Sequence, residues 1–215
     1  MVEVEKQKIS SIYDYVSSDS GVLRKANGAF VFGRADPLVA SRTAELYADG
    51  LVDYCLMSGG LGKDSGVLIG LEFPEAFYQA GLLRWTHKVP DKNIFVESKS
   101  RNGAECCTFG METILENDLP YNNLIIVVHS TSLRRTEAVM HVKATEKNFM
   151  ANYQRTGTKY SFNAENLVDQ KESVAELLRI ADWPAKGWAV PQNDLPIELV
   201  DYARLLDSKW KNEIK

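Results

Sequence analysis

The chain has 215 residues, a net charge of −4 and three cysteines. Its length is sufficient for one domain with a sizeable core. The acidic balance and the lack of any run of Lys or Arg longer than two argue against a nucleic-acid partner, which normally requires a basic face. Three cysteines do not build a disulfide framework and fit a reducing compartment. The first residues are charged, and the longest apolar run is about five residues. We therefore expect no signal peptide, no membrane span and a cytoplasmic location.

The first half of the chain alternates predicted helices with short apolar runs. Helical spacing of apolar residues predicts a helix over about 5–18, and Ala29–Phe32 forms the first run. A helix follows from Pro37 to about Tyr47. The second run, Tyr54–Met57, leads into a loop through Gly66 and a helical segment to about Trp85, which Pro74 should start or kink.

The second half continues the same alternation. The runs Asn93–Val96 and Leu124–Val128 each precede a helical stretch, over about 102–116 and 133–147 respectively. Lys159–Phe162 is a candidate fifth strand. Amphipathic helices over 172–180 and 197–210 complete the chain.

Each of the four apolar runs ends in small or polar residues and leads into a helix, which is typical of a buried parallel sheet. The pattern predicts an α/β, Rossmann-like open sheet, mainly parallel, with helices on both faces. We expect a single domain over 1–215, with a core at 28–163 and helical extensions at 1–27 and 164–215. In such sheets ligands bind outside the carboxyl ends of the strands.

Glycine-rich clusters follow the first two runs. These clusters are Gly33 with Arg34, and Ser58-Gly59-Gly60. Their glycines would let the backbone approach a ligand closely, and their amides beside a helix N-terminus could bind an anion. The alternative is that these glycines only form tight turns. Neither the G-x-G-x-x-G spacing nor a Walker A motif is present.

Polar residues gather after the third run, where Glu97, Ser100, Asn102 and Glu105 fall within nine residues. Such a cluster could hold ribose hydroxyls, an amine or a cation. The alternative is structural, because Asn102 and Glu105 have the spacing of a helix cap with a capping box.

The fourth run leads to His129, Ser130, Arg134 and Arg135. An arginine one turn into the following helix could bind a phosphate or carboxylate bidentately, or could be solvated on the helix surface. His129 has no second histidine at ligand spacing, so we expect no metal site. The serines lack the G-x-S-x-G context of a hydrolase, and Cys106 and Cys107 fit packing better than reactivity.

In this order, the motifs resemble the YdcF-like family, which includes the SanA and ElyC proteins. The matching residues span about 28–147 and are Val31-Phe32-Gly33, Arg42, Leu46-Tyr47, Gly50, Ser58-Gly59-Gly60, Glu75-Ala76, Val89-Pro90, Ile94–Glu97 with Ser100, Asn102 and Glu105, and Val128-His129-Ser130 with Leu133-Arg134-Arg135. The chain departs from the family pattern at Gly103, where the pattern has Thr, and at Cys106, where it has Asn.

The resemblance implies a Rossmann-like domain with polar residues at the carboxyl edge of the sheet and a largely unassigned activity. Soluble relatives look like nucleotide- or S-adenosylmethionine-type binders, and membrane-anchored relatives are linked to cell-envelope integrity. A Rossmann-like soluble protein with an S-adenosylmethionine or nucleotide-type ligand is therefore expected.

These observations lead to two functional hypotheses. The first is a site for a small anionic or nucleotide-like ligand, bound by Gly33, Arg34, Ser58, Gly59, Gly60, Ser100, Asn102, Ser130 and Arg135. If the ligand is also turned over, the candidate acid/base residues are Glu75, Glu97 and Glu105. The alternative is a non-catalytic regulatory or binding protein linked to cell-envelope metabolism.

Overall fold

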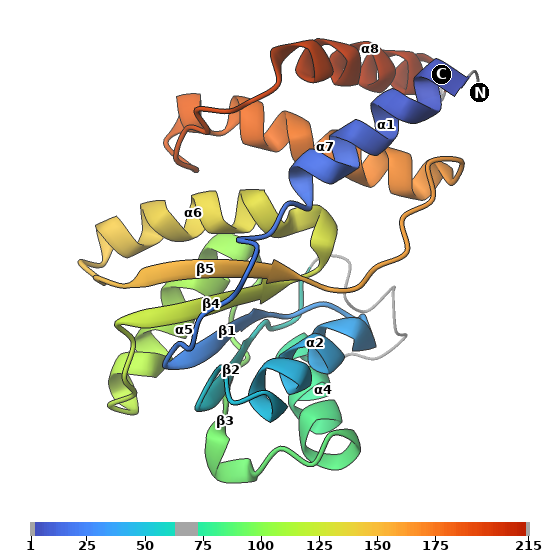
Figure 1. Cartoon of the computed structure of the whole chain (residues 1–215). Helices are drawn as coiled ribbons and strands as arrows, with labels where there is room; N and C mark the ends of the chain where they lie inside the picture. The colour runs from blue at the N-terminus through green and yellow to red at the C-terminus, as the bar shows by residue number, and fades with distance from the viewer. Residues whose placement is uncertain (1–2, 63–72, 214–215) are drawn as a thin grey trace.

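The computed structural model describes residues 3–62 and 73–213. A sheet of five strands forms its centre, in the spatial order β3-β2-β1-β4-β5, and every neighbouring pair is parallel (Figure 1). The strands are β1 (Gly28–Phe32), β2 (Tyr54–Ser58), β3 (Ile94–Glu97), β4 (Asn123–Val128) and β5 (Asn152–Gly157). The predicted α/β, Rossmann-like fold is confirmed, and the four apolar runs are adjacent parallel strands.

Helices cover both faces of the sheet because the strand side chains alternate between them. Phe30 and Leu56 lie in one apolar cluster with α5 and α6, whereas Val31 and Met57 lie in a second cluster with α2 and α4. The four helices are α2 (Pro37–Ala48), α4 (Glu75–Gly81), α5 (Gly103–Glu116) and α6 (Leu133–Glu146). A short π-helix, η1 (Leu82–Thr86), continues α4.

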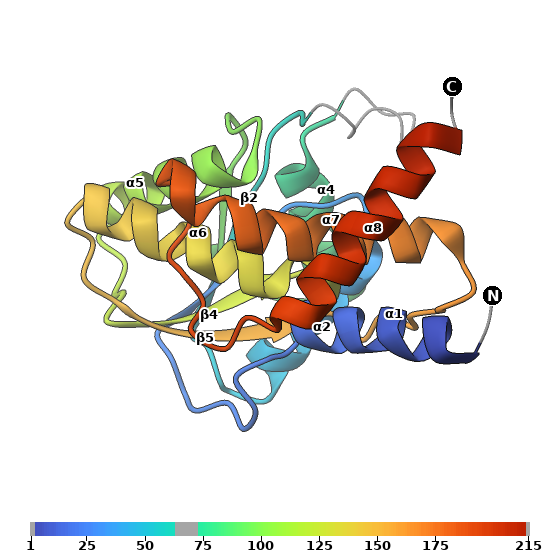
Figure 2. The same ribbon diagram turned by 90° about the horizontal axis from the view of Figure 1, so that it is seen from above.

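Three terminal helices form an additional layer beyond α6 (Figure 1). They are α1 (Glu3–Val16), α7 (Leu167–Asp182) and α8 (Ile197–Glu213). This layer has its own apolar cluster, which includes Ile12, Leu177 and Val200. α7 lies between α6 and α8 (Figure 1), and seen from above α8 crosses α7 (Figure 2). Within the described ranges, no helix has both the length and the apolar character needed to cross a membrane.

The prediction of a fifth strand at Lys159–Phe162 is wrong, because β5 lies earlier, at Asn152–Gly157. β5 is an edge strand with the polar sequence NYQRTG, and its burial is only partial, so it carries no apolar run. Tyr160 and Phe162 instead serve tertiary contacts: the Tyr160 hydroxyl donates to Asp169 at 2.6 Å, and Phe162 stacks on Tyr13.

The other boundaries agree with the predictions to within a few residues, except for the start of α7. Pro74 precedes α4, as expected, whereas the loop and helical segment predicted over 63–72 lie outside the described residues. α7 begins at Leu167, before the predicted start, because the side chain of Asn166 caps it by accepting a hydrogen bond from the Val168 amide.

The strand order creates a topological switch point between β1 and β4. From β1 the chain moves outward through β2 and β3, then returns to the other side of β1 to form β4. The loops after β1 and β4 therefore diverge to opposite faces and leave a crevice at the carboxyl edge of the sheet. Other open α/β sheets bind their ligands in the crevice at this point of the fold.

Candidate functional site

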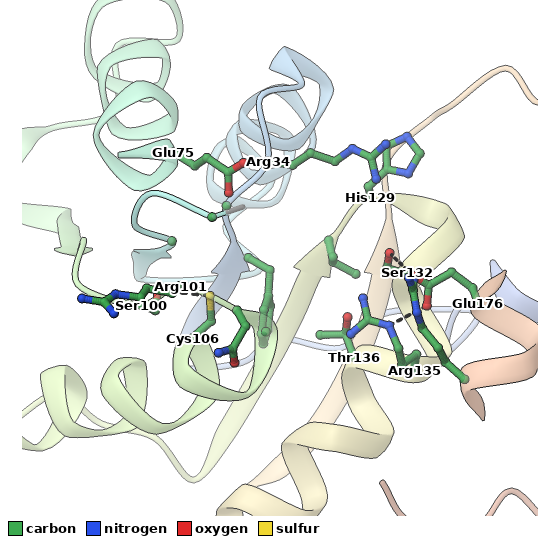
Figure 3. A pocket seen from close by; sticks show the side chains of 18 of the residues that line it. Arg34, Glu75, Ser100, Arg101, Cys106, His129, Ser132, Arg135, Thr136 and Glu176 are labelled. Atoms are coloured by element: carbon green, nitrogen blue, oxygen red, sulfur yellow. Dashed lines mark hydrogen bonds and ion pairs between the residues drawn. The ribbon is translucent and has the colours of Figure 1, made fainter. Parts of the chain in front are cut away.

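A cavity of about 520 Å³ lies at this switch point. Its volume is within the range of small-molecule sites. In Figure 3, Glu75 and Arg34 lie on one side of the open space, Cys106 on a second side and Arg135 with Thr136 on a third. The predicted site residues that line it are Gly33, Arg34, Gly59, Gly60, Glu75, Ser100, Asn102 and Arg135. Ser58, Glu97, Glu105 and Ser130 are outside its lining.

The glycines after β1 and β2 are required by close backbone packing. A Cβ on Gly59 would lie 2.9 Å from the Cα of Gly33, and a Cβ on Gly60 would lie 2.3 Å from the carbonyl oxygen of Ser100. Both distances are too short for non-bonded atoms. These glycines therefore let the ends of β1, β2 and the loop after β3 meet at the floor of the cavity.

The amides of this glycine cluster are already used inside the protein. The Gly59 amide donates to the carbonyl oxygen of Glu97 at 3.0 Å, and the Gly60 amide donates to that of Ser100 at 2.9 Å. The first two amides of α4 in turn donate to the carbonyl oxygens of Gly59 and Gly60. The amide N–H groups that were expected to bind an anion here instead donate hydrogen bonds that join the end of β2 to β3 and to the loop after β3.

Glu97 is a structural centre beside the cavity. Its side chain is buried, and Oε1 accepts hydrogen bonds from the amides of Lys99 and Ser100 at 2.5 and 2.9 Å. Oε2 accepts from the Ser58 hydroxyl at 2.7 Å, and that hydroxyl also lies 3.0 Å from the carbonyl oxygen of Cys106. Glu97 and Ser58 thus shape the loop that carries Ser100 to the cavity.

Asn102 and Glu105 form the helix cap that was the structural alternative for these two residues. Asn102 Oδ1 accepts from the Glu105 amide at 3.0 Å, and Glu105 Oε2 accepts from the Arg101 amide at 2.7 Å. The pair therefore caps α5 at its N-terminus. Asn102 still contributes to the cavity wall, but Glu105 does not.

The two adjacent arginines of α6 have different surroundings. Arg134 is turned away from the cavity, and its terminal nitrogens bind both carboxylate oxygens of Asp194. Its guanidinium also lies 4.0 Å from the ring centroid of Tyr15. Ser130, just before α6, donates from its hydroxyl to the carbonyl oxygen of Thr158. Arg134 therefore joins α6 to α1 and to the segment before α8, and Ser130 joins the start of α6 to the segment after β5.

Arg135 enters the cavity from α6. Its Nε donates to Glu176 Oε2 at 2.5 Å, and the side chain of Glu176 is only 3% exposed (Figure 3). The terminal nitrogen Nη1 lies 3.5 Å from the position that a Cβ on Gly103 would occupy. Among residues 3–62 and 73–213, the two terminal nitrogens of Arg135 have no hydrogen-bond acceptor.

Arg34 is more fully paired than Arg135. Both of its terminal nitrogens bind Glu172, at 2.6 and 3.3 Å, and Thr131 donates to the same carboxylate at 3.0 Å. Burial opposes ionisation of Glu172, but hydrogen bonding and charge attraction from Arg34 outweigh it and lower the pKa of that carboxyl. The pair therefore joins the loop after β1 to α7.

His129 lies at the same edge of the cavity. Burial and the nearby Arg34 charge lower the pKa of its imidazole, so the ring is neutral at pH 7. Nδ1 lies 2.8 Å from the Thr131 hydroxyl, and Nε2 lies 3.5 Å from Asp36 Oδ2. Within the described chain, no cluster of three or more histidines, cysteines and carboxylates could hold a metal ion.

Cys106 lines the cavity as a neutral thiol. Burial raises its pKa to about 11, and its sulfur lies 3.2 Å from the Ser100 hydroxyl. Such a thiol is a weak nucleophile at neutral pH. The packing role predicted for this residue agrees with its buried position.

Helix α7 supplies a wall of the cavity that was not predicted. Glu172, Glu176 and Arg179 come from its inner face. Their spacing of four and three residues does place them on one side of a helix. Sequence alone, however, gave no indication that this helix would cross the carboxyl edge of the sheet.

No family model matches the chain, and a comparison with curated proteins finds no match either.

Proposed function

We propose that the protein binds a small anionic ligand in the cavity at the switch point, with Arg135 as the principal anion-binding residue. The observation that carries the proposal is the side-on pairing of Arg135. Glu176 engages Nε and fixes the side chain, while the two terminal nitrogens face the cavity without an acceptor among the described residues. A guanidinium held in this way is preorganised for a carboxylate or phosphate.

The other arginines of the cavity are less suited to this role. The cavity lining includes Arg34, Arg101, Arg135 and Arg179. Arg34 uses both terminal nitrogens for its glutamate partner, and Arg179 donates from Nη1 to Glu176 at 2.7 Å. Arg101 extends away from the open space (Figure 3). Arg135 therefore combines the central position with the unsatisfied donors.

A nucleotide-like or S-adenosylmethionine-type ligand fits the volume and the mixed character of the cavity. Gly33 and Gly59 line the cavity with backbone, and Ser100 and Asn102 contribute polar groups to its wall. The resemblance of the motifs to the YdcF-like family supports the same ligand class. If the protein is a regulatory protein that binds this ligand without turning it over, we propose a role in cell-envelope metabolism, as the same resemblance implies.

Binding without turnover is the better supported form of this function. Glu97 and Glu105 are occupied by structural hydrogen bonds, and Cys106 is protonated at neutral pH. Glu75 is the one predicted acid/base residue that reaches the cavity. Should the ligand be turned over, Glu75 is the residue that we assign as its acid or base.

Calorimetric titration of wild-type protein and arginine variants tests the proposal. The probes are inorganic phosphate, ribose 5-phosphate, adenosine monophosphate and S-adenosylmethionine. Arg135→Ala should weaken binding of a phosphate-bearing probe by about ten- to a hundredfold, which corresponds to roughly 1.5–3 kcal/mol for a charge-assisted contact. Arg135→Lys should restore only part of the loss, because an ammonium cannot reproduce the bidentate contact.

The control is Arg204→Ala on α8, whose side chain is 55% exposed and pairs with Asp182 on the terminal layer. This variant should bind like the wild type. Equal affinities of the wild type, Arg135→Ala and Arg135→Lys would show that Arg135 does not bind the ligand, and the proposal would then be wrong.

A further inference from the structure

Gly103 is the first residue of α5, and its backbone does not require glycine. The described glycines with positive φ are Gly21, Gly50 and Gly187, so Gly103 has a backbone that any residue can adopt. Alanine is normally the better helix former at such a position. Neither the backbone conformation nor helix propensity therefore explains a glycine at position 103.

The surroundings of Gly103 differ from those of the other cavity glycines. A Cβ on Gly33, Gly59 or Gly60 would overlap neighbouring atoms at 3.0 Å or less. A Cβ on Gly103 would approach Nη1 of Arg135 at 3.5 Å, which is ordinary van der Waals contact. A methyl group thus fits at this position without displacing the protein, and it would cover one side of the guanidinium.

We propose that Gly103 determines specificity by keeping the terminal nitrogens of Arg135 accessible to an oxyanion. This inference rests on the proposed function. An acceptor oxygen binds a guanidinium nitrogen at about 2.9 Å, which is closer than the methyl contact. A side chain at position 103 would therefore occupy part of the volume that a ligand oxygen needs.

The same geometry restricts the chemical class of the ligand. Glu176 holds the Nε side of Arg135, so a ligand approaches the opposite end, between the two terminal nitrogens. A compact oxyanion with two oxygens on one atom, such as a phosphate monoester or a carboxylate, matches that end.

The test compares Gly103→Ala and Gly103→Val with the wild type, using inorganic phosphate and adenosine monophosphate as calorimetric probes. We expect Gly103→Ala to bind about tenfold more weakly, and Gly103→Val to bind more weakly still. The thermal midpoint of Gly103→Ala should equal or exceed that of the wild type, because alanine favours the helix. Binding of Gly103→Ala should thus weaken while its stability is kept or raised, which separates this role from a structural one.

A double-mutant cycle provides the matched control. In the Arg135→Ala background, adding Gly103→Ala should cause no further loss, because the contact that the methyl group obstructs is already absent. A further tenfold loss in that background would show that the methyl group acts elsewhere, and the inference would be overturned.

The remaining outcomes separate the inference from the function on which it rests. If the wild type binds phosphate through Arg135 but Gly103→Ala and Gly103→Val bind equally well, the inference fails and the proposed function stands. If the wild type shows no saturable binding of either probe, both are overturned.

Discussion

Replacement of Glu97 separates a structural carboxylate from a catalytic one. The residue is 4% exposed, and its side chain accepts three hydrogen bonds, from two backbone amides and from the Ser58 hydroxyl. Glu97→Ala leaves these donors buried without their acceptor, at about 1–3 kcal/mol for each group. Because water can satisfy part of this loss, we expect a decrease of about 3–5 kcal/mol in the free energy of unfolding.

Glu97→Gln should be far milder. The amide oxygen can take the place of Oε1 and accept from both backbone amides. Its NH₂ group then faces Ser58, whose hydroxyl can accept this hydrogen bond and turn its own proton to the carbonyl oxygen of Cys106, 3.0 Å away. All groups keep a partner, and the expected cost is about 1 kcal/mol.

Urea unfolding followed by circular dichroism measures both variants, with the free energy taken from linear extrapolation. Ligand affinity of Glu97→Gln should equal that of the wild type. A loss below 1 kcal/mol for Glu97→Ala, or equal losses for both variants, would refute this account of the loop.

Three further predictions concern packing, charge and reactivity. Gly59→Ala should lower the free energy of unfolding by about 2 kcal/mol in urea titrations, since its Cβ would meet the Gly33 backbone at 2.9 Å. The pKa of Glu172 is lowered from an ordinary value of 4.5, so its stabilisation is present above that pH and is lost as the pH falls through the folded pKa. Glu172→Gln should therefore destabilise the protein more at pH 7 than at pH 3 in thermal unfolding, and an equal loss at both would contradict the assignment. Cys106, with its pKa raised to about 11, should resist iodoacetamide at pH 8 in the folded protein and react fully in urea, as mass spectrometry can show.

The strands differ in how far the sequence predicts them. β4 was predictable because five consecutive apolar residues are buried between two helical layers. β5 was not, because an edge strand with a half-exposed face needs no apolar run. Tyr160 and Phe162 gave a false strand signal, since their apolar character serves contacts outside the sheet.

The candidate site was predictable only in part, for a related reason. The parallel topology brings the ends of β1, β2 and β4 together, so Gly33, Gly59 and Arg135 could be placed at one edge from the sequence. The sequence does not reveal which polar groups satisfy each other. The Glu97 carboxylate and the Gly60 amide are engaged within the protein, which only their three-dimensional neighbours determine.

The sequence also does not predict which of two neighbouring helical residues enters the cavity. Arg134 and Arg135 are indistinguishable by type, but successive helical residues point about 100° apart, so only one enters the cavity. The partner of Arg135, Glu176, belongs to a helix predicted as a mere extension. Its role depends on how α7 packs across the sheet edge, which amphipathic spacing alone does not define.

The most direct measurement of the central claim is an NMR titration of the ¹⁵N-labelled protein with inorganic phosphate and adenosine monophosphate, following the glycine amides and the Arg135 Nε signal. If the cavity binds an anion through Arg135, the signals of Gly103 and Arg135 should shift and saturate together, whereas those of Gly21 and Gly50, which lie outside the cavity lining, should not move. Shifts that never saturate, or that fall equally on Gly21 and Gly50, would contradict the claim.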